Sequence, residues 1–272
     1  MKHLFSKAGQ QALHEVMSHA PMLAFDFDGT LAPIVARPDD ASVPLSISQH
    51  LQKLASMLPT VIVTGRQIAD VAPRLNFQPR VIVGNHGAED PGAPLSGQAA
   101  WREHMAPMRA LLQAHQAQLD EAGVQLEDKG HSLALHYRLA KDHEHALAVI
   151  ESLIGSAGSQ VRVFGGKCVV NVVSASAPDK GDAVLRLAQL MAVTHGVFMG
   201  DDVNDEPVFR KAPPHWLTVR IGREDPLSQA RFFLDSHSEV APMLQGMIAA
   251  FRPDPPPPAP PQASPGPGSA PA

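Results

Sequence analysis

The chain has 272 residues, a mass of 29.0 kDa and a formal net charge of −5, with 44% hydrophobic and 18% charged residues. These values predict a globular core domain with a smaller inserted one. The acidic balance disfavours nucleic-acid binding, which needs a basic surface. No run approaches the ~20 apolar residues of a membrane span. Met1–Lys7 lacks the apolar core of a signal peptide, and Cys168 is the only cysteine. We expect a cytoplasmic protein without membrane contact.

Both ends of the chain alternate short apolar runs with amphipathic stretches, as strands and helices of a parallel sheet do. Strands are predicted at 22–25, 60–63, 81–83, 197–199, 217–221 and 232–234. Helices are predicted at 7–19, 46–58, 67–75, 180–191, 204–211 and 239–251. This order indicates one α/β sheet covered by helices on both faces.

The middle of the chain differs, and it predicts a compact α/β unit of its own. A long helix at 101–122 precedes strands at 124–127 and 132–137, a helix at 142–154, and strands at 160–164 and 168–173. We expect a core at 1–85 and 176–252, with the inserted unit at 86–175. Half of the residues from 253 to 272 are proline, which predicts a disordered tail without a core.

Two groups of aspartates follow predicted strands, where ligands bind in open α/β sheets. Asp26 and Asp28 end the first apolar run, although Asp28-Gly29 alone would also fit a turn. Asp201 and Asp202 end another, and Asp205 follows. Capping of a helix by Asn204 would not explain the two aspartates at the strand end. Two acidic strand ends indicate a hard divalent cation, and Mg²⁺ fits because it combines carboxylates with phosphate and water.

Two further segments supply phosphate contacts. Thr64-Gly65-Arg66 ends a strand, and Thr64 can donate from its hydroxyl and its backbone N–H, although a helix N-cap is an alternative. Lys180 opens a predicted helix, where a cation opposes the helix dipole. Pairing with Asp26 and a phosphate oxygen would explain that lysine.

The order of these four segments resembles the haloacid dehalogenase (HAD) phosphatase superfamily. Its Rossmann-like core with a parallel sheet is thereby implied, and the inserted unit resembles an α/β cap of the C2 type. More closely, segments 26–33, 84–89, 127–138 and 200–206 resemble the trehalose-6-phosphate phosphatase family. The resemblance implies hydrolysis of a sugar phosphate through an aspartyl-phosphate, by a protein that we expect to be a monomer.

The resemblance also implies roles for single residues. Asp26 would be the nucleophile, Asp28 the general acid and base, and Thr64 and Lys180 would hold the transferred oxygens. Mg²⁺ would bind Asp26, the backbone carbonyl of Asp28 and Asp201, with Asp202 and Asp205 as direct ligands or their neighbours. The candidates for substrate binding are Gly65, Arg66, Asn85, His86, Glu89, Lys129, His136, Arg138, Lys167 and Asn171.

One departure keeps other functions open. Asn171 stands where the family usually has a glutamate in a strand that touches the sugar, which puts the disaccharide contacts in question. The alternatives are a phosphatase for sucrose 6-phosphate or mannosyl-3-phosphoglycerate, a phosphotransferase resembling phosphomannomutase, and an inactive sensor of sugar phosphates. The intact set of Asp26, Asp28, Lys180 and Asp201 argues against the sensor.

Overall fold

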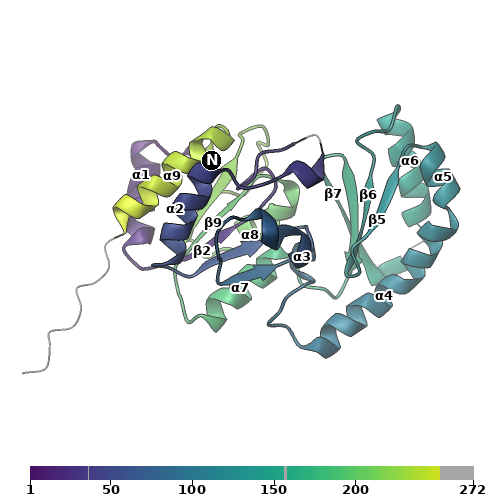
Figure 1. Ribbon diagram of the computed structural model, residues 1–272, viewed down its shortest axis with the longest axis horizontal. Helices are drawn as coiled ribbons and strands as arrows, with labels where there is room; N and C mark the ends of the chain where they lie inside the picture. Colours follow the sequence, from purple (N-terminus) through teal and green to yellow (C-terminus); the bar gives the residue numbers. More distant parts are fainter. Residues whose placement is uncertain (36, 156–157, 252–272) are drawn as a thin grey trace, which may run out of the picture.

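Two β-sheets organise the chain (Figure 1). The computed structural model describes residues 1–35, 37–155 and 158–251, so the tail predicted at 253–272 lies outside it. A seven-stranded sheet forms the core, and a four-stranded sheet with its helices forms the cap. Within these ranges no helix is both long and apolar enough to cross a bilayer.

The core sheet is parallel throughout, as the alternating pattern predicts. Its strand order is β1-β11-β10-β9-β2-β3-β4, and every neighbouring pair runs parallel. The strands are β1 (Lys2–His3), β2 (Met22–Phe25), β3 (Thr60–Val63), β4 (Val81–Val83), β9 (Gly196–Gly200), β10 (Leu217–Ile221) and β11 (Phe232–Leu234). The central position of β2 and β9 brings the two acidic strand ends side by side.

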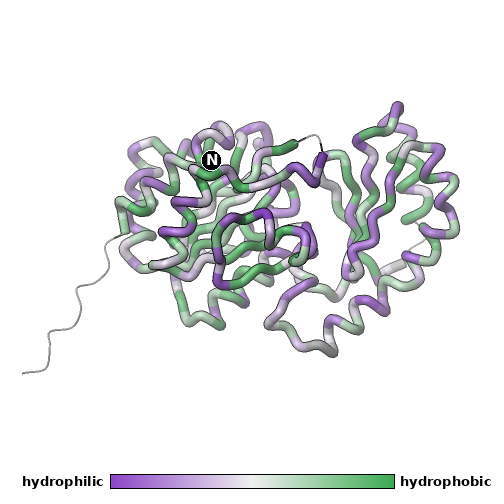
Figure 2. The backbone as a smooth tube through the Cα atoms, viewed as in Figure 1, coloured by the Kyte–Doolittle hydropathy of each residue, from purple (hydrophilic) through white to green (hydrophobic). Residues whose placement is uncertain are grey.

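Side chains of the core strands alternate between two apolar layers. Leu23 and Phe25 pack with α1 (Lys7–Met17), α2 (Leu45–Ala55) and α9 (Val240–Ala250). Met22 and Ala24 face the other layer, with α7 (Lys180–Leu190) and α8 (Glu206–Lys211). The hydrophobic colour in Figure 2 is accordingly concentrated in the central strands. Both faces are buried, which makes the sheet a rigid base for groups at its edge.

The cap is an antiparallel sheet with helices on one face. Its strand order is β5-β6-β8-β7, from β5 (Gln125–Asp128), β6 (Ser132–His136), β7 (Val161–Gly166) and β8 (Val169–Ser174). Leu133, Leu135 and Val172 pack against α4 (Leu95–Ala114), α5 (Gln116–Glu121) and α6 (His143–Ile154). The opposite face of the sheet is turned toward the core in Figure 1.

Several predicted elements differ from those observed, each for a local reason. The helix at 67–75 is instead α3 (Ile68–Val71) followed by a 3₁₀ turn, because Pro73 has no N–H to continue it. The helix at 101–122 begins earlier, after Pro94, and is interrupted at His115, whose φ of −106° is not helical. Cys168 is a turn residue with φ of 62° rather than the first residue of a strand.

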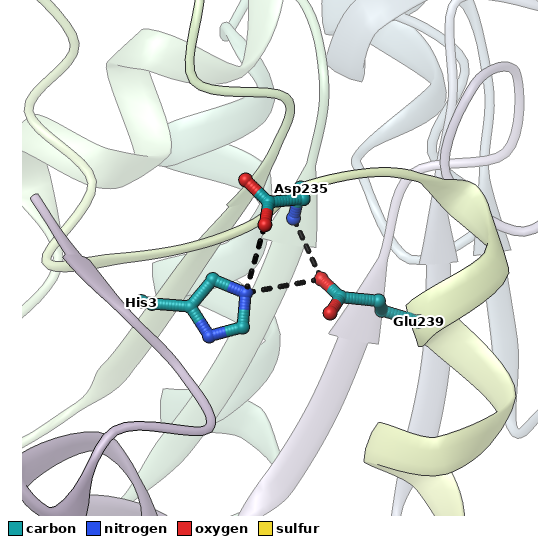
Figure 3. A group of neighbouring side chains, drawn as sticks. All are labelled: His3, Asp235 and Glu239. Atoms are coloured by element: carbon teal, nitrogen blue, oxygen red, sulfur yellow. Dashed lines mark hydrogen bonds and ion pairs between the residues drawn. The ribbon is translucent and has the colours of Figure 1, made fainter.

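The two-residue strand β1 was not predicted, because its sequence carries no alternating pattern. His3 holds it in place from the side (Figure 3). The Nε2 atom of His3 lies 3.2 Å from Glu239 Oε2 and 3.5 Å from Asp235 Oδ2, while Phe5 N–H donates to its Nδ1. The backbone N–H of Asp235 also donates to Glu239 Oε2 at 2.7 Å. These contacts join the first strand to the start of the last helix.

A buried hydrogen-bond chain joins the core to the cap. Asn85 lies in the loop that follows β4, and its Nδ2 donates to Glu89 Oε2 at 2.8 Å. The hydroxyl of Ser132 in β6 donates to Asn85 Oδ1 at 2.7 Å. Asn85 and Ser132 are both buried, so neither group can exchange its partner for bulk water.

We predict that Ser132→Ala destabilises the protein, since it leaves Asn85 Oδ1 buried without its donor. The expected loss in the free energy of unfolding is about 1–3 kcal/mol, measured by urea denaturation. Ser56→Ala is the matched control, because that hydroxyl donates to a carbonyl at an exposed helix end. Equal effects of the two substitutions would contradict the importance of this junction.

Candidate active site

The site is built where β2 and β9 end. These strands are neighbours in register, with Phe25 opposite Met199, and Asp26 N–H donates to Met199 O at 2.9 Å. Asp26 and Asp201 therefore emerge together at the carboxyl edge of the sheet. Both are nearly inaccessible to solvent, with 5% and 3% of their surface exposed. Burial of two adjacent carboxylates requires compensating positive charge.

Lys180 supplies the first part of that charge. Its Nζ atom donates to Asp26 Oδ1 at 2.7 Å and to Asp205 Oδ1 at 2.8 Å, and the residue is 1% exposed. Lys180 is the first residue of α7, which Asp179 and Asp182 start with a capping box. The two buried carboxylates thus compensate for a cation at the unfavourable end of a helix dipole. The pairing of Lys180 with Asp26 agrees with the interpretation of the sequence.

Asp205 organises the loop after β9. Its Oδ2 accepts hydrogen bonds from the backbone N–H groups of Asp201 at 2.9 Å and Asp202 at 3.1 Å. A Cβ at Gly200 would lie 2.4 Å from the Asp205 carboxyl carbon, so a glycine is required there. Gly29 has φ of 78°, and a Cβ there would lie 2.0 Å from Asp201 Oδ2. These glycines let the two acidic loops approach each other closely.

The pKa values of the buried carboxylates reflect this crowding. Burial raises the pKa of Asp26 well above its ordinary range, against the attraction of Lys180, and Asp205 and Asp201 raise it further. Burial, followed by the charge of Asp205, raises the pKa of Asp201 to about 6. Burial opposes the charged form of Lys180, yet Asp205 and Asp26 hold its pKa above the ordinary value. Lys180 alone therefore does not fully compensate the charge of these carboxylates when they are ionised.

The residues present suit a divalent cation. Asp26, Asp201 and Asp205 are all buried, and each offers a carboxylate oxygen within 4.8 Å of the others. Oxygen ligands and surplus negative charge are what hard cations require. The side chain of Asp202 lies outside this group, because it accepts from Val203 N–H at 2.8 Å and caps the following turn. Asp202 caps that turn and Asp205 precedes α8, so Asn204, the alternative cap considered from the sequence, caps neither of them.

In the segment Thr64-Gly65-Arg66, the hydrogen bonds differ from those predicted for a phosphate site. The Thr64 backbone N–H donates to Val83 O at 2.9 Å and is not free for a phosphate. Its hydroxyl accepts from Arg66 N–H at 3.1 Å and keeps its own proton to donate. Thr64 is not a helix cap, because α3 begins later, at Ile68. The Arg66 side chain pairs with Asp28 instead of turning toward Asp26.

Two side chains of the cap, Lys167 and Lys129, contact the core, and Arg138 supports the first of them from within the cap. Lys167, at the tip of the β7–β8 hairpin, donates to Asp201 Oδ2. Lys129 Nζ donates to Gly65 O at 3.3 Å, and Arg138 donates to Lys167 O at 3.0 Å. All three are residues that the sequence analysis named for substrate binding. The cap thus brings basic groups to the acidic edge of the core sheet.

His86 fills the junction between the two sheets. It is 6% exposed, its ring meets Phe164 edge-on at 4.8 Å between centroids, and it shares a hydrogen bond with the side chain of Asn171. A Cβ at Gly65 would lie 2.4 Å from the His86 ring, which explains the glycine. Burial, then the charges of Lys180 and Lys129, lowers the pKa of His86 well below its ordinary value. The ring is therefore neutral near pH 7, and its buried Nδ1 has no hydrogen-bond partner within the described residues.

Glu127 is a member of the site that sequence reasoning did not single out. His136 Nε2 lies 2.8 Å from Glu127 Oε2, and Lys129 Nζ lies 3.5 Å from the same oxygen. Gln125 pairs with His136 in the antiparallel register, so Glu127 is on the same sheet face. The spacing of two residues between Glu127 and Lys129 was the signal that could have identified it. Asn171 lies opposite Ala134 and thus on that face as well.

Comparison with solved structures defines the class of fold. The structure of the Candida albicans trehalose-6-phosphate phosphatase C-terminal domain matches 88% of this chain and 96% of its own, with a TM-score of 0.75 and 20% identity. The sucrose-phosphatase from Synechocystis, solved with sucrose and phosphate, matches 86% of this chain and 98% of its own, with a TM-score of 0.58 and 18% identity. The fold is that of the HAD phosphatases.

Sequence comparison identifies the family. The model of the trehalose-phosphatase family matches residues 24–238, and the chain belongs to that family. A probable trehalose-phosphate phosphatase of Sinorhizobium fredii is 38% identical over 238 residues, which are 84% of this chain and 86% of that protein. The trehalose-phosphate phosphatase of Mycobacterium ulcerans is 31% identical over 236 residues, 81% of this chain but only 60% of that protein.

We predict that pH and metal act on stability through Asp201. The folded state raises the pKa of Asp201 from 3.8 to about 6. Its contribution to the free energy of unfolding is therefore complete below pH 3.8 and is lost as the pH rises past 6. In the metal-free protein, Asp201→Asn should therefore raise the melting temperature at pH 7.5 by about 5 °C and change it little at pH 4.

Thermal denaturation with EDTA measures this effect, and addition of Mg²⁺ should stabilise the wild type more than the variant. Asp120→Asn, on an exposed helix face, serves as the control and should be neutral at both pH values. Destabilisation by Asp201→Asn at pH 7.5 would contradict the excess negative charge.

Proposed function

We propose that the protein hydrolyses trehalose 6-phosphate to trehalose and phosphate with Mg²⁺ as cofactor, acting as a monomer in the cytoplasm. The observation that carries this proposal is the buried Asp26 beside Lys180, Asp201 and Asp205, facing a polar sheet of the cap. Membership of the trehalose-phosphatase family supports the substrate. Asp26, Asp201 and the backbone carbonyl of Asp28 would hold Mg²⁺, with Asp205 beside them. Bound there, the ion would offset repulsion between carboxylate and phosphate.

The first half of the reaction transfers the phosphoryl group to the protein. Lys180 engages Oδ1 of Asp26, so Oδ2 is the oxygen that attacks phosphorus. The bond between phosphorus and the sugar oxygen breaks, and Asp28 donates a proton to that oxygen. Lys180 and the hydroxyl of Thr64 stabilise charge on the transferred oxygens.

The second half returns the protein to its starting state. A water molecule attacks phosphorus, and Asp28 accepts its proton. The bond between phosphorus and Asp26 breaks, phosphate leaves, and Asp28 is again protonated for the next turnover. The Lys180 ammonium stays between Asp26 and Asp205 during both steps, so the nucleophile keeps its position.

The cap would bind the sugar. Lys129, His136 and Glu127 are neighbours on the face directed at the core, and they offer donors and an acceptor for hydroxyl groups. Asn171 extends this face, and its amide can also pair with a hydroxyl. Arg138 and Lys167 close the face at the hairpin tip. Asn85 and Glu89 are paired with each other, which favours a role in holding the cap over a sugar contact.

Replacement of the nucleophile should abolish turnover. Asp26→Asn keeps the size of the side chain but removes the attacking oxygen anion, and we expect a loss of at least about 10³-fold in kcat. Phosphate release from trehalose 6-phosphate with Mg²⁺ measures it, and circular dichroism verifies the fold. Asp202→Asn is the matched control from the neighbouring loop and should retain most of the activity. Substantial turnover by Asp26→Asn would refute covalent catalysis.

The preference of the protein for one substrate should be measurable by comparing several sugar phosphates. We expect Mg²⁺-dependent phosphate release from trehalose 6-phosphate to exceed that from sucrose 6-phosphate, glucose 6-phosphate and mannosyl-3-phosphoglycerate. In the same assay, Lys129→Met should raise KM for trehalose 6-phosphate about tenfold while activity on p-nitrophenyl phosphate, which has no sugar, changes little. Preference of the wild type for another ester would overturn the substrate, and equal effects of Lys129→Met on both esters would contradict the sugar contact.

A further inference from the structure

Arg66 makes an unusually complete set of contacts around Asp28. Its Nε donates to Asp28 Oδ2 at 2.7 Å, and its Nη2 donates to Asp28 Oδ1 at 2.8 Å. This is a two-pronged pairing of a planar guanidinium with a carboxylate, which fixes the direction and the plane of the carboxyl group. The interaction joins the ends of β2 and β3, two adjacent strands of the core sheet.

The guanidinium is itself held from other sides. Its Nη1 donates to Asp70 Oδ2 at 2.8 Å, its Nη2 also donates to Pro38 O at 2.9 Å, and its carbon lies 5.3 Å from the centre of the Phe27 ring. The Arg66 side chain is only 11% exposed. Burial acts against the charge of Arg66, yet Asp28 and Asp70 hold its pKa above the ordinary value. A cation fixed in this way cannot turn to follow a moving phosphate.

Asp70 is in turn shared with a second arginine. Arg74 Nη2 donates to Asp70 Oδ1 at 2.6 Å, and Arg74 Nε donates to the same oxygen at 3.0 Å. No contact between Arg74 and Asp28 is present in the described part of the chain. Arg74 therefore belongs to the same ionic network as Arg66 but does not contact Asp28.

The position of Asp28 differs from that of the nucleophile. Its side chain is 40% exposed, whereas the side chain of Asp26 is 7% exposed, and its carboxylate is not part of the Asp26-Asp201-Asp205 group. Asp28 thus lies at the outer side of the site, where a departing sugar oxygen would leave.

We propose that Arg66 is a positioning residue that fixes the carboxyl group of Asp28 toward the leaving-group oxygen. This inference rests on the proposed role of Asp28 as general acid. Arg66 then acts through Asp28 and not on the phosphate, in contrast to the substrate contact suggested by its place in the sequence. The consequence is specific. Loss of the two-pronged pairing between Arg66 and Asp28 should slow the hydrolysis of an ester more strongly when its leaving group is more basic.

The test compares phenyl phosphate with p-nitrophenyl phosphate. The two esters have nearly the same shape and no sugar, but p-nitrophenolate is the weaker base and needs less protonation on departure. The ratio of their kcat/KM values reports only steps up to the departure of the phenol, so it excludes the later attack of water. Arg66→Lys keeps the charge and removes the two-pronged pairing, and Arg66→Met removes both.

We expect Arg66→Lys and Arg66→Met to lower kcat/KM for phenyl phosphate about tenfold more than for p-nitrophenyl phosphate. Asp28→Asn should shift the ratio in the same direction by about 100-fold, and Asp28→Asn combined with Arg66→Lys should add little to it. Arg74→Lys is the matched control and should leave the ratio unchanged. Circular dichroism shows that each variant is folded, and release of p-nitrophenol in the first turnover shows that its site still binds the ester.

Equal losses on both esters would overturn the inference, because they would indicate contact with the phosphate or a purely structural role. An unchanged ratio in both Arg66 variants would overturn it as well. Failure of the wild type to hydrolyse trehalose 6-phosphate would instead refute the proposed substrate, and the aryl-ester comparison would still decide the role of Arg66. If Asp28→Asn leaves the ratio unchanged, the acid role of Asp28 and this inference are both contradicted.

Discussion

The site depends on the buried ion pairs that the ammonium group of Lys180 forms with two aspartates. This group lies between Asp26 and Asp205, and all three residues are almost completely removed from water. Loss of one charge from such a group would leave its partners unpaired in a poorly polarisable environment, at a cost of several kcal/mol. The three charged groups are therefore stable in the core only together. Lys180 fixes Oδ1 of Asp26, while Oδ2 of Asp26 accepts no hydrogen bond from it.

The architecture explains how such a unit can be built. β2 and β9 are central in a sheet that is covered on both faces, so their ends are held by the entire core. Gly29 and Gly200 remove the side chains that would separate the acidic loops. The cap supplies the complementary basic groups, with Lys167 on Asp201 and Lys129 on Gly65 O. The core sheet thus holds the buried acidic groups, and the cap brings basic groups to them.

Most strands of the core and the pairing of Lys180 with Asp26 could be predicted from the sequence, because local sequence patterns determine them. The strands at 22–25, 60–63, 81–83, 217–221 and 232–234 have the observed bounds, since short apolar runs that end in polar residues predict buried parallel strands well. The pairing of Lys180 with Asp26 followed from a cation placed against a helix dipole. The break at His115 and the strand β1 lacked such signals, because tertiary contacts decide them.

The arginine of Thr64-Gly65-Arg66 illustrates what local patterns cannot predict. Its place after a strand suggested a phosphate contact, but its direction depends on Asp70, Pro38 and Phe27, which only the fold brings together. Glu127 was missed for a related reason, because its importance comes from cross-strand neighbours in the antiparallel cap sheet.

The most direct test of the account is the location of the transferred phosphoryl group. Asp28→Asn treated with p-nitrophenyl phosphate forms the covalent species readily and hydrolyses it slowly, because the leaving group needs little protonation but the water needs a base. Acid quenching followed by peptide mass spectrometry should find the phosphoryl group on Asp26. A phosphoryl group on another residue, or turnover without any phosphorylated protein, would contradict the account.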